Sequence, residues 1–199
     1  SSADIPPSIA NGGTGFRVKT NDWINALNWI STDTSSNSVI TSWWDYGYWI
    51  TTLGNRTSLA DNATINQTRI ATIAKMFMDQ TDNGLKIAQD LKSDYIVVYI
   101  VGQRFSGINS SELYVLGNGG DESKKQWFIR IGGFDENRYL EQDGFTPTPF
   151  FWNSTLLGQL IPFTPVSYIL NGAPSAEYQP GAMAIYSKDI KYPQNATAE

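Results

Sequence analysis

The chain has 199 residues, of which 41% are hydrophobic and 13% aromatic, and its formal net charge is −5. It contains no cysteine and no histidine, which excludes disulfides, thiol chemistry, a Ser-His-Asp triad and a His-rich zinc site. Only carboxylates remain as acids, bases or hard-metal ligands. The negative charge argues against nucleic acid as the main partner, because phosphate binding requires a basic face.

The first part of the chain combines polar linkers, one helix and an aromatic segment. Residues 1–15 are rich in Pro, Gly and Ser, which indicates a lead-in linker. Apolar residues at helical spacing predict a helix over 21–30. Residues 39–43 are expected to be extended, and Gly47 and Gly54 are expected to allow tight turns on either side of "YWITTL".

The middle of the chain predicts two helices and a strand. A polar, Asn-rich stretch covers 55–66, and apolar residues at helical spacing follow it over 70–77. Asn83 is expected to cap a second, short helix. Residues 95–101 form the longest apolar run. This run is far shorter than the roughly 20 residues that cross a bilayer, and its length suits a buried strand.

The last part of the chain begins with a glycine-rich hinge at 117–120, and Asp121 lies at a natural helix start. Three apolar residues of that helix are expected on roughly one side: Trp127, Phe128 and Ile131. A further helix is predicted over 150–160, before two prolines, and 182–192 reads as a strand or hairpin. We therefore expect a single α+β domain over 1–199, with a helix-rich mixed α/β core and a small β-sheet.

The segment "SWWDYGYWI", residues 42–50, places five aromatic rings around one carboxylate, Asp45. One interpretation is an aromatic corner of the core in which the acid caps a helix or turn. The other is a small polar pocket, in which the carboxylate accepts a hydrogen bond from a hydroxyl and the rings exclude water. Such a pocket would reject an analogue that lacks the hydroxyl, because its buried polar groups would then be unpaired.

The pentapeptide at 43–47, with "GNRT" and "DN" downstream, resembles the signature motif of the oligosaccharyltransferase catalytic subunit, the enzyme of asparagine-linked glycosylation. In that family the motif lies in a soluble domain that follows a bundle of transmembrane helices. It binds the Ser or Thr at position +2 of the acceptor sequence Asn-x-Ser/Thr. The resemblance implies substrate-binding roles for five residues and direct contact with the hydroxyl for the first three: Trp43, Trp44, Asp45, Tyr46 and Gly47.

A second segment, "DESKKQWFIRI", resembles the motif Asp-x-x-Lys-x-x-x-Met-x-x-Ile, which archaeal and eukaryotic members carry on a kinked helix beside the first motif. The matching positions are Asp121, Lys124 and Ile131, and Phe128 stands where the family has Met. Without the resemblance, the segment would read as an amphipathic helix with an Asp-Lys pair at i,i+3. The resemblance implies that these four residues also belong to the substrate-binding site, that Lys124 lies close to Asp45 and that the source is archaeal.

The resemblance also implies what this chain lacks. In the family, the catalytic carboxylates and a divalent cation, Mn²⁺ or Mg²⁺, belong to loops of the membrane region, so the isolated chain is expected to be inactive. The acidic pairs at 121–122 and 135–136 are expected to be solvated and receive no catalytic role. The expected partners are an acceptor polypeptide, a lipid-linked oligosaccharide and the enzyme's own N-terminal transmembrane region. The domain would lie on the external face of the cell membrane.

Acceptor triplets Asn-x-Ser/Thr are themselves frequent in this chain. Candidate glycosylation sites are Asn55, Asn62, Asn66, Asn109 and Asn195. Asn153 also begins a triplet but falls in a predicted helix with aromatic neighbours, so it is the weakest candidate. The frequency of these triplets favours a domain on the glycosylated side of a membrane, although a chain merely rich in Asn, Ser and Thr would show the same pattern.

Two other classes of protein are compatible with the composition. A carbohydrate-binding module would use exposed tryptophans to stack on sugar rings, but no all-β pattern runs through the chain. A glycoside hydrolase fragment would need two carboxylic acids about 5–9.5 Å apart, a distance that sequence does not reveal.

Overall fold

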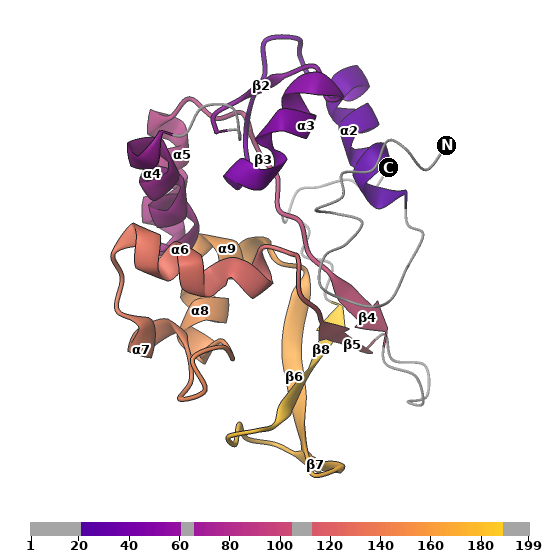
Figure 1. Ribbon diagram of the computed structural model, residues 1–199, viewed down its shortest axis with the longest axis vertical. Helices are drawn as coiled ribbons and strands as arrows, with labels where there is room; N and C mark the ends of the chain where they lie inside the picture. Colours follow the sequence, from indigo (N-terminus) through magenta and orange to yellow (C-terminus); the bar gives the residue numbers. More distant parts are fainter. Residues whose placement is uncertain (1–20, 61–65, 105–112, 189–199) are drawn as a thin grey trace.

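The computed structural model describes residues 21–60, 66–104 and 113–188, and it shows helices grouped against two small sheets (Figure 1). This confirms the expected α+β class. The helices, including two 3₁₀ segments, are α2 (Asp22–Asp33), η1 (Trp44–Tyr46), α3 (Gly47–Thr52), α4 (Gln67–Met78), α5 (Thr81–Asp90), η2 (Glu122–Lys124), α6 (Lys125–Gly132), α7 (Glu136–Tyr139), α8 (Pro149–Ser154) and α9 (Leu156–Leu160).

The strands form one parallel and one antiparallel sheet among the described residues. The three-stranded parallel sheet has the order β2-β1-β3, and the five-stranded antiparallel sheet has the order β4-β5-β8-β6-β7. The strands are β1 (Val39–Thr41), β2 (Thr57–Ser58), β3 (Tyr95–Ile96), β4 (Gly102–Arg104), β5 (Leu113–Leu116), β6 (Phe163–Leu170), β7 (Ala173–Ser175) and β8 (Met183–Lys188).

The parallel sheet determines where the aromatic segment lies. Parallel neighbours need a crossover connection, and here η1 and α3 connect β1 to β2, while α4 and α5 lie between β2 and β3 in the sequence. β1 is therefore the central strand, and the segment 42–47 follows directly from its carboxyl end. The carboxyl ends of parallel strands, where the connections diverge to either side, are a common location for ligand sites.

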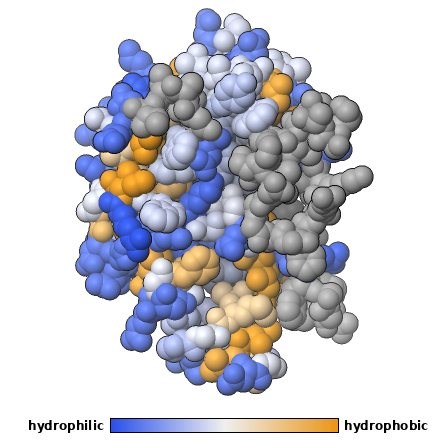
Figure 2. Space-filling model, in the orientation of Figure 1, coloured by the Kyte–Doolittle hydropathy of each residue, from blue (hydrophilic) through white to orange (hydrophobic). Residues whose placement is uncertain are grey.

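One apolar core joins the helices to both sheets. Its largest fully buried apolar side chains are Ile40, Ile50, Ile73, Met76, Phe77, Met78, Phe128, Ile129, Phe151, Leu156 and Leu157. Some apolar side chains remain on the surface. Figure 2 shows apolar area over the lower part of the molecule, where β6 and β8 run, and Val166 and Met183 are exposed there.

The predictions for the first part of the chain hold in part. α2 buries Trp23, Leu27 and Ile30 on one face, and residues 39–43 are extended, as predicted. The prediction of tight turns around "YWITTL" is wrong at Gly47, which begins helix α3 with a φ of −58°, whereas the chain does turn at Gly54 after that helix. Gly54 also serves close packing, since a Cβ there would lie 2.6 Å from the carbonyl oxygen of Ile50.

In the middle of the chain, helix α4 confirms the prediction over 70–77, but two other predictions are wrong. α5 begins at Thr81, two residues before the expected cap Asn83. The apolar run 95–101 contains only the two-residue strand β3, and its side chains are half-buried or exposed. The backbone of Tyr99 is bonded to Asp121 rather than to a neighbouring strand, which ends the pairing early.

The predicted helix over 150–160 is divided into α8 and α9 at Thr155. The Thr155 hydroxyl donates to the carbonyl of Phe151 at 2.7 Å and accepts from the N–H of Gly158 at 3.0 Å, so it caps α9. β8 confirms the expected strand as far as Lys188, and 189–192 lie outside the described residues, as does the linker 1–15. β4, β5 and β6 were not predicted.

Arg56 joins the end of α2 to the turn after α3 and is buried. Its guanidinium donates to the Thr34 hydroxyl at 2.9 Å and to three backbone carbonyls: Ser31 at 2.8 Å, Thr34 at 2.7 Å and Asn55 at 2.8 Å. A guanidinium fork suits this planar set of acceptors, and the last carbonyls of a helix attract positive charge.

Arg56→Met should lower the free energy of unfolding by about 2–4 kcal/mol, because carbonyls buried around the guanidinium lose their donors. Urea denaturation followed by circular dichroism measures this change. Arg69→Met is the matched control, since Arg69 is exposed and its guanidinium makes one long contact with the described residues, and it should change stability by less than about 0.5 kcal/mol. Equal effects of both substitutions would contradict the prediction.

Candidate acceptor-binding site

The aromatic segment divides its side chains between the core and the surface. Trp43 follows β1 in extended conformation and is only 4% exposed. Its ring centroid lies 4.3 Å from that of Phe128 on α6. Trp44 is half-buried beside it, at a centroid distance of 6.5 Å. The 3₁₀ turn of η1 then leaves Asp45 partly exposed to solvent.

Asp45 forms an ion pair with Lys124, a residue 79 positions away in the sequence. The Lys124 ammonium donates to Oδ2 of Asp45 at 2.6 Å, and the two side chains are 21% and 29% exposed. Lys124 also donates to the Tyr46 hydroxyl at 3.0 Å. This contact confirms the expectation that the two motifs meet. In the described part of the chain Asp45 caps no helix.

Asp121 connects the second motif to the run after β3. Its Oδ2 accepts the N–H of Tyr99 at 2.9 Å, and its own N–H donates to the Tyr99 carbonyl at 2.6 Å. The chains approach so closely that a Cβ on Gly120 would lie 2.8 Å from that carbonyl oxygen. Burial raises the pKa of Asp121 to about 7, and the Tyr99 N–H and the Lys124 ammonium oppose this shift.

Tyr46 is the buried neighbour of these charged groups. Burial raises the pKa of its phenol above the usual range, and the carboxylates of Asp121 and Asp45 raise it further. The phenol therefore stays protonated at neutral pH, and its oxygen accepts from Lys124 while it lies 3.5 Å from the carbonyl oxygen of Gly119. Tyr46 thus holds Lys124 from the side opposite to solvent.

Phe128 keeps the apolar role of the Met that the family motif has at this position. It is fully buried between Trp43 and Phe77, whose ring stacks on it at a centroid distance of 5.7 Å. The expectation that Trp127, Phe128 and Ile131 share one side is wrong, because Trp127 and Ile131 are exposed. Residues four apart lie on the same face of a helix, whereas Phe128 points about 100° away from Trp127.

Residues 36–105 match the family model described as "STT3/PglB/AglB core domain". The chain is also 38% identical over 136 residues to the dolichyl-diphosphooligosaccharide–protein glycosyltransferase subunit STT3B of Oryza sativa subsp. japonica, an alignment that covers 67% of this chain and 17% of the relative. The chain belongs to the STT3/PglB/AglB family. This confirms the resemblance inferred from the two motifs.

Other relatives of this STT3/PglB/AglB chain are similar over a comparable region. The STT3 subunit of Dictyostelium discoideum is 34% identical over 149 residues, which are 73% of this chain and 19% of that protein. The crystal structure of the C-terminal globular domain of oligosaccharyltransferase from Archaeoglobus fulgidus is 21% identical with a TM-score of 0.48, and the match covers 86% of this chain and 99% of that one. The chain spans less than a fifth of the length of these curated relatives.

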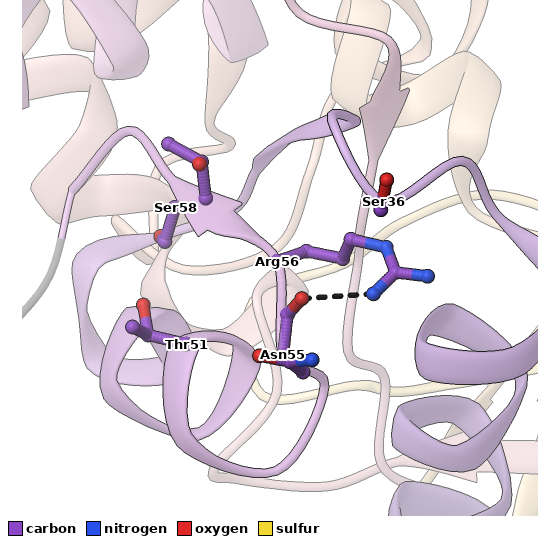
Figure 3. Close-up of a pocket in the computed structure, with 6 residues that line it drawn as sticks. Ser36, Thr51, Asn55, Arg56 and Ser58 are labelled. Atoms are coloured by element: carbon purple, nitrogen blue, oxygen red, sulfur yellow. Dashed lines mark hydrogen bonds between the residues drawn. The ribbon is translucent and has the colours of Figure 1, made fainter.

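The described acceptor triplets of this family member differ in their surroundings. Asn55 is exposed at a turn with a φ of 50° and borders an open depression of about 350 Å³, whose other lining residues are Ser36, Thr51, Arg56, Thr57 and Ser58 (Figure 3). Asn66 caps α4, accepting from the N–H of Arg69. Asn153 is exposed on α8. Thr155, the third residue of its triplet, is buried, and its hydroxyl donates a hydrogen bond to the Phe151 carbonyl. Asn62, Asn109 and Asn195 lie outside the described residues, and glycosylation of Asn55 stays a prediction.

The expectation that the acidic pair 121–122 is solvated is wrong, because Asp121 and Glu122 are both buried. Glu122 forms an ion pair with Lys125, and sequence reasoning missed both residues. The i,i+3 spacing of Glu and Lys was a visible signal, but the same spacing is common on solvated helix faces. The pair 135–136 is polar as expected: Asp135 caps α7, and Glu136 pairs with Arg130 on the surface.

The buried carboxyl group of Asp121 should make the stability of the chain depend on pH. Its folded pKa of about 7 exceeds the unfolded value of about 3.9. The folded state therefore retains a proton that the unfolded state has already lost. The stability from Asp121 is fully present below about pH 4 and is lost as the pH rises to about 7.

Asp121→Asn should remove this component. The difference in free energy of unfolding between wild type and Asp121→Asn should change by a few kcal/mol from pH 4 to pH 7.5, in favour of the variant at the higher pH. Urea denaturation of both proteins at several pH values measures this difference. The other carboxyl groups contribute equally to the stability of both proteins, so their contribution cancels. Parallel stability curves for the two proteins would show that Asp121 titrates at its ordinary pKa.

Proposed function

We propose that this domain binds the acceptor polypeptide of protein N-glycosylation, with Asp45 accepting a hydrogen bond from the hydroxyl of the Ser or Thr at position +2. The observation that carries the proposal is the state of Asp45: it is partly exposed, and Lys124 holds its Oδ2 at 2.6 Å. Within the described part of the chain, Oδ1 accepts no hydrogen bond. A carboxylate fixed on one side is thus ready to accept a donor on the other.

The neighbours of Asp45 give this site its selectivity. Trp43 is buried against Phe128, and Trp44 is half-buried beside it, so the two residues that directly precede Asp45 are aromatic and largely withdrawn from solvent. Lys124 compensates the negative charge, so a neutral hydroxyl is a better ligand than a cation. Replacing the hydroxyl by a methyl group would leave a desolvated carboxylate oxygen unpaired, which is the arrangement that discriminates most strongly between isosteric ligands.

The curated relatives are named as glycosyltransferase subunits, and we extend their function to this chain as part of the same proposal. The whole enzyme would transfer a glycan from a lipid-linked donor to the acceptor Asn. This domain would lie on the external face of the cell membrane, next to the enzyme's own N-terminal transmembrane region. None of the helices in the described ranges is long and apolar enough to cross a membrane.

The residues of this site do not fit a divalent cation. Oδ2 of Asp45 is paired with Lys124, and Oδ2 of the buried Asp121 is occupied by the Tyr99 N–H. Across the described ranges, no three acidic side chains converge as ligands. Following the family resemblance, we propose that the Mn²⁺ or Mg²⁺ and the catalytic carboxylates belong to parts of the whole enzyme outside this chain.

The structure argues against the other two classes of protein. The motif tryptophans are packed rather than displayed, and the most exposed ones, Trp29 and Trp127, lie on different helices, α2 and α6. A sugar-binding platform would need such rings side by side and accessible. The acidic pairs are engaged in caps, ion pairs and backbone contacts, so neither pair presents two free carboxylic acids.

Asp45→Ala in the full-length enzyme should nearly abolish transfer. A hydrogen bond to a charged group accounts for about ten- to a hundredfold in binding, and loss of acceptor positioning adds roughly a further hundredfold. The same change in this chain alone should shift its melting temperature by only a few degrees, because a partly exposed ion pair contributes at most about 1 kcal/mol. Peptide glycosylation assays and thermal denaturation measure the two effects.

The acceptor peptide supplies the control for this prediction. Replacing the +2 Thr by Val should cost the wild-type enzyme heavily but should cost Asp45→Ala little, because the hydroxyl has already lost its partner. An unchanged Thr/Val ratio combined with a large loss of stability would instead assign Asp45 a purely structural role.

The isolated 199-residue chain should show no transferase activity with lipid-linked glycan, Mn²⁺ or Mg²⁺ and an acceptor peptide. The reason is that the carboxylates of its site are already engaged by Lys124 and by backbone. Mass spectrometry of the peptide detects any product. Glycopeptide formed above the level of a boiled sample would show that the reacting groups belong to this chain.

A further inference from the structure

A buried ion pair lies next to the candidate site in the sequence, on either side of Lys124. The Lys125 ammonium lies 2.8 Å from Oε1 of Glu122 and donates to the Glu122 carbonyl at 3.2 Å. The two side chains are 0% and 5% exposed. Lys125 also lies 4.0 Å from the centroid of the Phe145 ring. Glu122 and Lys125 fall on positions that the family motif leaves unspecified, and the site as described above does not use them.

Stability alone does not explain this pair. Removing two charges from water costs several kcal/mol, and a buried pair can often be replaced by apolar residues of similar volume without loss of stability. Burial lowers the pKa of Lys125, and Glu122 opposes that shift, which shows how strongly the two charges depend on each other. The best-attested role for such a pair is to select one arrangement among alternatives of similar energy.

In the alternative arrangement, two adjacent lysines would exchange their places. Lys124 and Lys125 follow each other in the sequence, and both lie where the 3₁₀ turn η2 becomes helix α6. Lys124, at the junction with φ −102° and ψ 1°, reaches Asp45, whereas Lys125 reaches Glu122. A shift of one residue rotates a helix by about 100° and would bring the wrong lysine towards Asp45.

We propose that Glu122 and Lys125 are positioning residues: their buried ion pair determines the register of the η2–α6 junction and thereby places Lys124, rather than Lys125, on Asp45. Within this turn the Glu122 carboxylate pairs with Lys125, which lies at the i,i+3 spacing. It cannot pair with Lys124 instead unless the turn opens. The same register buries Phe128 against Trp43. This inference rests on the proposed function for its effect on acceptor binding, but its structural effect can be measured without it.

The test replaces both charges with neutral side chains of similar size, Glu122→Gln together with Lys125→Met. The melting temperature of this double variant should stay within about 5 °C of wild type, as expected for an apolar replacement of a buried pair. The amine of Lys124 should nevertheless react roughly five- to tenfold faster with acetic anhydride, because it spends less time paired with Asp45. Mass spectrometry of the fragments gives the rate for each lysine, with the exposed Lys86 as the internal reference.

The matched control removes an ion pair that joins α6 to α7. Arg130 and Glu136 form an exposed pair, so Arg130→Met together with Glu136→Gln should leave the labelling rate of Lys124 unchanged. If the first double variant fails to fold, Glu122→Gln alone carries the test, because it keeps an acceptor for Lys125 but removes the charge. A faster rate at Lys124 supports the proposal, and an unchanged rate in a folded variant overturns it.

In the full-length enzyme the same double variant should raise the KM for the acceptor peptide by roughly five- to tenfold and change kcat by less than about twofold. Faster labelling of Lys124 with an unchanged KM would leave the positioning of Lys124 established and would contradict the proposed role of the site in acceptor binding. Unchanged labelling would overturn the positioning role whatever the KM. The two proposals therefore fail in different measurements.

Discussion

The ion pair between Lys124 and Asp45 is the contact on which the candidate site depends. It joins two segments 79 residues apart, and at 2.6 Å it requires both backbones to be held closely. The core supplies that support, because Phe128 of α6 packs on Trp43 at the end of the central parallel strand. A partly exposed pair of this kind adds little stability by itself. Its geometry is a consequence of the packing beneath it.

The aromatic segment combines the two interpretations that its sequence allows. Trp43 and Tyr46 are core residues, whereas Asp45 remains accessible to solvent. The buried rings fix the turn that carries the carboxylate, and Lys124 compensates its charge. Packing and recognition are therefore properties of neighbouring residues in the same turn. This explains how a surface acid can be held in place while it keeps one oxygen for a ligand.

Local patterns predicted the elements whose stabilising contacts are local. Apolar spacing located α2 and α4, and the glycine-rich hinge located the start of the second motif, since a helix forms its hydrogen bonds within one segment. The antiparallel sheet was mostly missed because its central strand β8 pairs with β5 and β6, which lie far from it or out of order in the sequence, and β4 is a short, exposed strand at the edge. The apolar run 95–101 was overestimated as a strand because its backbone pairs with Asp121. A hydroxyl of Thr155 was enough to divide one predicted helix into two.

The sequence by itself determined the family and named the residues of the candidate site, because two unusual motifs carry the resemblance. It also determined that no histidine or cysteine takes part. Tertiary structure decided that Lys125 pairs with Glu122 inside the core, and that Asp121 and Glu122 are buried. The burial of a helix face depends on which other parts of the chain pack against it. An i,i+3 pair of opposite charges has the same sequence pattern whether it faces water or the core.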